Sequence, residues 1–174
     1  MTLTEKKSNK MTPTKQYIHI LENTVKKGEL SLLRSSADQE LDHTLTGFDL
    51  FTGLWWPLRQ KSQRAPRRQV AWMIAKLYAC YPIAHSSEDE TKTLARQLAL
   101  LCPPKDEKFR YRFDTLLILP LHNIEPALRW ALALLYSNHM SLNWVKLTDD
   151  LSIWERESVR LRWAEEFLNN LRHH

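Results

Sequence analysis

Residues 66–82 read PRRQVAWMIAKLYACYP, and this stretch decides the fold class. Apolar side chains recur at helical spacing from Val70 to Tyr81. Pro66 and Pro82 stand where a helix begins and where it stops. No segment of the chain alternates with the period of two that a convincing strand requires. The sequence therefore predicts an all-α protein.

Similar helical patterns lie on both sides of this stretch. They cover residues 15–27, 29–34, 94–101, 106–119, 124–137, 142–153 and 155–172. Gly28 stands at the position of a carboxy-terminal helix cap. Ser87 and Glu90 have the spacing of a capping box for the helix that follows them. The chain is therefore expected to hold about eight or nine helices.

The pair Pro103 and Pro104 ends one helix and is the best candidate for a domain boundary. We expect two small helical bundles packed end to end. The three predicted parts are a disordered tail at 1–12, an N-terminal bundle with a basic face at 13–103, and a C-terminal bundle at 104–174.

Two apolar series predict the core of the C-terminal bundle. The first is Trp144, Leu147, Leu151 and Trp154, and the second is Leu161, Ala164, Leu168 and Leu171. Both series follow helical spacing, so each defines one face of a helix. We expect these two faces to pack against each other.

Positive charge is concentrated in the first part of the chain. The whole chain carries 25 Lys and Arg against 20 Asp and Glu, and residues 1–76 hold 13 basic and 7 acidic side chains. Residues 57–76 contain six basic side chains and no acidic one, so local ion pairs cannot neutralise them. A segment of this kind favours a polyanionic partner.

Within that segment, Arg68, Trp72 and Lys76 are spaced by four and so lie on one helix face. This order of cation, ring and cation suits a phosphate backbone. The alternative is that Trp72 packs against a neighbouring element while the two cations are solvated.

The sequence offers no enzyme signature and predicts no cofactor or metal. Its three glycines are too far apart for a phosphate-binding loop, and no histidines or cysteines have metal-ligand spacing. Adjacent carboxylates such as Asp149 and Asp150 point about 100° apart on a helix, so we interpret them as surface charge. Cys80 and Cys102 are expected to be reduced, buried thiols. The absence of a long apolar run predicts a cytoplasmic protein without a membrane partner.

Two carboxy-terminal segments closely resemble one family. Residues 142–154, LNWVKLTDDLSIW, and residues 159–167, VRLRWAEEF, resemble the CasB family, the small subunit of the type I-E CRISPR complex called Cascade. Further similar segments are GELSLLRSS at 28–36, LWWPL at 54–58, PRRQVAWMIAKLYA at 66–79, RYRFDTLL at 110–117 and ALRWALALL at 127–135.

The resemblance implies a non-catalytic, all-helical subunit that is present in two copies beside other Cascade subunits. Its basic residues are expected to contact guide RNA and target DNA and to stabilise the R-loop in antiviral defence. The candidate contacts are Arg34, Arg59, Arg67, Arg68, Lys76, Arg112, Arg129 and Arg162. Arg162 is the weakest of these, because Glu166 can pair with it one helical turn away.

Two other functions stay open on the sequence alone. The first is a helical scaffold that holds partner proteins without touching nucleic acid. The second is a metal-free nuclease. Phosphate binding weakens steeply with salt and an apolar interface does not. Salt dependence therefore separates the nucleic-acid binding that the resemblance implies from the scaffold.

Overall fold

The computed structural model describes residues 11–37, 39–40, 48–86 and 89–171, which form nine α-helices and one short 3-10 helix. In chain order these are α1 (Pro13–Asn23), α2 (Lys27–Ser35), α3 (Phe48–Lys61), α4 (Arg68–Cys80), α5 (Leu94–Leu101), α6 (Glu107–Ile118), η2 (Leu121–Asn123), α7 (Glu125–Ser137), α8 (Trp144–Ser152) and α9 (Glu157–Asn170). The all-α prediction is confirmed. None of the helices in these ranges has the length and apolar character needed to cross a membrane.

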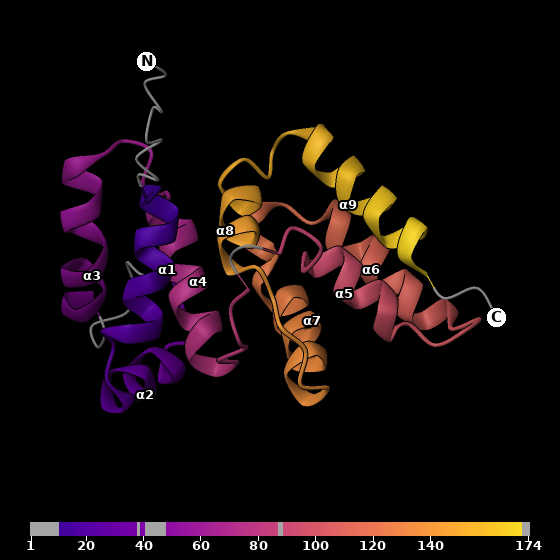
Figure 1. The fold of residues 1–174 in the computed structure, drawn as a ribbon, viewed down its shortest axis with the longest axis horizontal. Helices are drawn as coiled ribbons and strands as arrows, with labels where there is room; N and C mark the ends of the chain where they lie inside the picture. Colours follow the sequence, from indigo (N-terminus) through magenta and orange to yellow (C-terminus); the bar gives the residue numbers. More distant parts are fainter. Residues whose placement is uncertain (1–10, 38, 41–47, 87–88, 172–174) are drawn as a thin grey trace, which may run out of the picture.

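The helices gather into two lobes (Figure 1). In the N-terminal lobe, α2 packs on α4 and α1 packs on α3. In the C-terminal lobe, α5 packs on α7 and α9, and α6 packs on the same two helices. Both α7 and α8 contact α4, and α8 also contacts α1, so these two helices join the lobes. One continuous cluster of buried apolar side chains runs through both.

The packing of α5 bears on where the two lobes divide. This helix precedes Pro103 and Pro104 in sequence, yet its partners α7 and α9 follow them. The segment before α5 is tied to the segment before α8, because the Leu142 amide donates to Ala84 O at 3.0 Å. We therefore propose that the lobes divide within residues 81–93 instead of at the proline pair.

Several helix ends differ from the sequence-based expectation. Gly28 lies inside α2 and does not cap the preceding helix. The side chain of Thr93 caps α5, where its hydroxyl accepts the amide of the third helical residue at 3.4 Å. The expected capping residue, Ser87, lies outside the described residues. Thr93 is the local signal that the sequence analysis missed, since threonine is a common N-cap residue.

The core of the C-terminal lobe is partly as predicted. All four members of the first apolar series are buried, as is Leu171. Leu161 and Leu168 were wrongly assigned to the core, because they are 56% and 58% exposed. The buried face of α9 instead holds Val159, Trp163 and Phe167. The two aromatic rings bury more apolar area than leucines would, and this favours their side of the helix.

Candidate nucleic-acid interface

Four exposed cations surround the connection between α3 and α4. We call residues 61–68 the basic turn, after its exposed members Lys61, Arg64, Arg67 and Arg68. Arg59 supports the turn from α3, since its Nη1 donates to Gln63 O at 2.6 Å and to Ala65 O at 3.1 Å. The Trp55 indole donates to Pro66 O at 2.7 Å. These three carbonyls are bonded to α3, so the turn is held in place while its cations remain at the surface.

Arg67 pairs with a carboxylate that its own segment lacks. Its Nη2 lies 3.0 Å and 3.3 Å from the two carboxylate oxygens of Glu155, which is 88 residues further along the chain. A backbone hydrogen bond at Glu155, followed by the bond from Arg67, lowers the pKa of that carboxyl. Both side chains are well exposed, at 45% and 62%. Exposed ion pairs contribute about 0–1 kcal/mol, so a phosphate can replace the carboxylate at low cost.

Arg68, Trp72 and Lys76 were expected to form an exposed phosphate-binding face of α4. Only Arg68 of these three is exposed. Trp72 is 3% exposed, and its indole donates to Gln39 O at 2.8 Å. Lys76 is 2% exposed, and its Nζ lies 2.8 Å from Glu125 Oε1. The packing of α7 on α4 brings that carboxylate to the lysine. Lys76, which was predicted to contact nucleic acid, is therefore a poor candidate for such a contact, whereas Arg68 lies at the surface.

A cleft of about 540 Å³ opens beside Arg68. It lies between α4, η2 and the first turn of α7, and Trp72, His122 and Pro126 also line it. The ion pair of the buried Lys76 and the half-buried Glu125 forms part of its wall. The cleft thus continues the exposed surface of the basic turn towards the C-terminal lobe.

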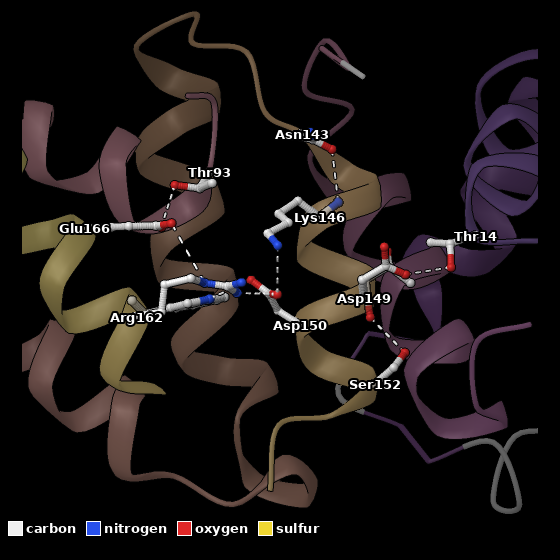
Figure 2. A network of polar contacts seen from close by, with 11 residues as sticks. Thr14, Thr93, Asn143, Lys146, Asp149, Asp150, Ser152, Arg162 and Glu166 are labelled. Atoms are coloured by element: carbon white, nitrogen blue, oxygen red, sulfur yellow. Dashed lines mark hydrogen bonds and ion pairs between the residues drawn. The ribbon is translucent and has the colours of Figure 1, made fainter. Parts of the chain in front are cut away.

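Arg162 belongs to a network of polar contacts between α8 and α9 (Figure 2). Its guanidinium bonds to Asp150, and its Nε lies 3.8 Å from a carboxylate oxygen of Glu166, as the spacing predicted. Trp163 Nε1 donates to the second oxygen of Asp150 at 2.7 Å. Thr93 Oγ1 donates to Glu166 at 2.8 Å. Arg162 therefore holds two helices together and is a poor candidate for a phosphate contact.

Asp150 corrects another expectation, since the sequence analysis placed it on the surface. It is 4% exposed, and its two carboxylate oxygens are covered by the Arg162 and Trp163 side chains of α9. Its neighbour Asp149 points to the opposite side and accepts the Thr14 hydroxyl of α1 at 2.7 Å (Figure 2). The adjacent carboxylates diverge, as expected for a helix, and do not form an acid and base pair.

The remaining candidates are dispersed. Arg34 Nε donates to Ala79 O at 3.1 Å and so ties α2 to the end of α4. Arg129 is half-buried on α7. Arg112 is exposed on α6, with its guanidinium carbon 5.7 Å from the centre of the Trp130 ring. Of the eight predicted residues, only Arg67 and Arg68 share the basic turn. Lys61 and Arg64 join them, and the acid-free segment already contained that signal.

Comparison with known proteins places this geometry in a family. The family model described as CRISPR-associated protein Cse2 matches residues 29–168. A CasB crystal structure from M. ruber is 21% identical, with a TM-score of 0.73 over 92% of this chain and 94% of that one. CasB from Thermus thermophilus is 24% identical, with a TM-score of 0.69 over 91% and 99%. CasB from Thermobifida fusca is 18% identical, with a TM-score of 0.65 over 89% and 94%. These identities show a shared fold, and no curated protein sequence matched the chain.

Proposed function

Because this chain belongs to the CRISPR-associated Cse2 family, we propose that it is a non-catalytic nucleic-acid-binding subunit of the Cascade surveillance complex. In this function it contacts the backbones of guide RNA and target DNA and stabilises the R-loop. The basic turn is the observation that carries the proposal: four exposed cations stand within eight residues on a turn held by α3. Its cytoplasmic location is part of the same proposal.

The energetics of strand exchange make such a surface useful. An RNA–DNA hybrid is about as stable as the duplex DNA that it replaces, so the opening of the target is nearly balanced. Backbone contacts that favour the opened state can then decide the outcome. Arginine and lysine contacts to phosphate do not depend on base sequence, which suits a subunit that must accept every guide.

The set of contacts that we propose is smaller than the set predicted from the sequence. We assign phosphate contacts to the basic turn and retain Arg112 and Arg129 as contacts on the C-terminal lobe. Arg34 and Arg59 bond to backbone carbonyls, and we assign them a positioning role. Lys76 and Arg162 are removed from the set, because each is engaged in an ion pair within the fold.

Other Cascade subunits and a second copy of this chain are the proposed protein partners. An apolar stripe on α9 supports protein contact, since Leu161 and Leu168 are seven residues apart and both are more than half exposed. A scaffold without nucleic-acid contact is thus the second candidate function. In that case the stripe on α9, and not the basic turn, would determine assembly.

Charge reversal of the basic turn tests the proposal. In the double variant Arg67→Glu, Arg68→Glu, the complex is expected to retain its guide RNA through other subunits and to open target duplex poorly. Permanganate footprinting of unpaired thymines in the displaced strand measures this opening. If both arginines touch phosphate, the slope of log affinity against log salt falls in magnitude by roughly 1.4 to 1.8, at about 0.7 to 0.9 per contact.

A matched control is the double variant Lys26→Glu, Lys27→Glu. These adjacent lysines are also exposed and lie at the start of α2, and their reversal changes the net charge by the same amount. The control complex is expected to give wild-type footprints. Wild-type footprints from the arginine variant would contradict the assignment of the basic turn and favour the scaffold.

A further inference from the structure

A second hollow lies on the C-terminal lobe, in a groove of about 620 Å³ between α6 and α7. Tyr111 stands on its rim and is 74% exposed, the second-largest exposure among the large apolar side chains of the described residues. Arg112 and Trp130 line the groove, with the guanidinium over the indole ring. The Phe109 ring packs edge-on against the indole, with 5.2 Å between the two ring centroids. The groove therefore presents an exposed ring beside a supported pair of planar groups.

The charges of the groove are balanced. Lys108 and Arg112 stand against Asp106 and Glu107. The Asp106 carboxylate also accepts the amide of Phe109 at 2.9 Å and thereby caps α6. Phosphate attraction alone would be weak at such a site. Planar aromatic and guanidinium groups instead offer surfaces on which nucleobases stack, a contact that is tolerant of base sequence.

One face of α7 joins this groove to the cleft beside the basic turn. Pro126 lines the cleft, while Trp130 and Leu134 line the groove. The three residues are spaced by four, so they lie along a single side of the helix. Eight residues of helix span about 12 Å. A strand bound at Arg68 can thus follow α7 into the groove without leaving the surface.

We propose that the groove between α6 and α7 is a base-stacking site for single-stranded nucleic acid, with Tyr111 and the Arg112–Trp130 pair as its platforms. This inference rests on the proposed function and deepens it: the basic turn holds phosphates, and the groove holds unpaired bases of the same strand. A duplex keeps its bases stacked on one another, so the groove selects the opened strand.

Two probes separate the contribution of the bases to binding affinity from that of the phosphates. The first is a fluorescently labelled single-stranded DNA of about 16 nucleotides. The second is a strand of the same length and phosphate count in which the central nucleotides are abasic. Anisotropy titration of the full chain against both probes, at one salt concentration, gives the contribution of the bases as the ratio of the two affinities.

The Tyr111→Ala variant is expected to bind the base-containing strand at least about fivefold more weakly than wild type, which corresponds to about 1 kcal/mol per stacked base. Its affinity for the abasic strand is expected to be unchanged. Tyr111→Phe keeps the ring and should behave as wild type. Tyr136→Ala is the matched control, because Tyr136 is also an exposed tyrosine, at 48%, but does not line the groove.

The remaining results overturn the inference. Equal affinity of wild type for the two strands, or no effect of Tyr111→Ala on either, excludes stacking at the groove. Loss of co-purifying Cascade subunits from Tyr111→Ala, with both strand affinities unchanged, would instead identify a protein-docking surface. If wild type binds neither strand, the stacking site is excluded, and footprinting of the assembled complex still decides the proposed function. The Arg67→Glu, Arg68→Glu variant should weaken both probes equally, so a failure of the basic turn is distinguishable from a failure of the groove.

Discussion

Removal of the Asp150 carboxylate should destabilise the fold far more than removal of its neighbour Asp149. In Asp150→Ala, the indole N–H of Trp163 loses its acceptor at 2.7 Å. Because Trp163 is only 2% exposed, water cannot replace that acceptor. An unsatisfied buried donor costs about 1–3 kcal/mol. The variant also removes the main partner of Arg162.

The ion pair adds less than a fully buried one would. The Arg162 side chain is 35% exposed, so water can solvate it once the carboxylate is gone. We therefore assign about 1 kcal/mol to the lost ion pair and about 2 kcal/mol to the unsatisfied indole donor, and expect a total loss of about 3 kcal/mol. For a chain of this size, about 2–4 °C per kcal/mol gives a fall in Tm of roughly 6–12 °C.

Asp149→Ala removes the same chemical group one residue earlier. Asp149 is exposed as a residue, and its carboxylate accepts one hydroxyl, from Thr14 at 2.7 Å. Partial burial of this carboxylate raises its pKa. We expect a loss of about 0.5–1.5 kcal/mol. Asp150→Asn should fall between the two alanine variants, because the amide oxygen can still accept the indole N–H while the charge is lost.

Urea unfolding, followed by circular dichroism, measures all three variants on one scale. The midpoint gives the change in stability, and an unchanged slope shows that the native and denatured states are otherwise comparable. Equal losses for the two alanine variants would refute the argument, since they would show that burial and the bond to Trp163 do not distinguish the two carboxylates.

Two further predictions concern a buried ring and an exposed pair. Trp154→Ala should lower the free energy of unfolding by about 3–5 kcal/mol, because Trp154 is 2% exposed and donates to Leu119 O at 2.9 Å. The control Trp56→Ala should leave Tm nearly unchanged, because Trp56 is 48% exposed. An unchanged Tm for Trp154→Ala would contradict its placement in the core. Glu155→Gln should release Arg67 for phosphate, strengthen binding of single-stranded DNA and steepen the salt slope by up to about 0.7–0.9. Glu157→Gln removes the same charge nearby, and equal affinities for these two variants would exclude a specific effect on Arg67.

Local information in the sequence was sufficient for the helices and insufficient for the choice of buried face. Helical spacing and prolines found nearly every helix, because these signals act within a few residues. On α9 two apolar stripes competed, one through Leu161 and Leu168 and one through Trp163 and Phe167. Both have helical spacing, so periodicity cannot choose between them. The choice depends on α5 and α6, which pack on this helix from elsewhere in the chain.

Local sequence was also insufficient to predict which cations of the site are paired within the fold. Residues 57–76 contain no acid, yet the fold brings Glu155 to Arg67 and Glu125 to Lys76, from 88 and 49 residues away. The two pairs differ in their consequence because they differ in exposure. Lys76 is sealed against α7 and would have to leave the core to reach a phosphate, whereas Arg67 can exchange one exposed anion for another. A count of local charge thus finds a candidate surface, and only burial tells which of its cations a polyanion can reach.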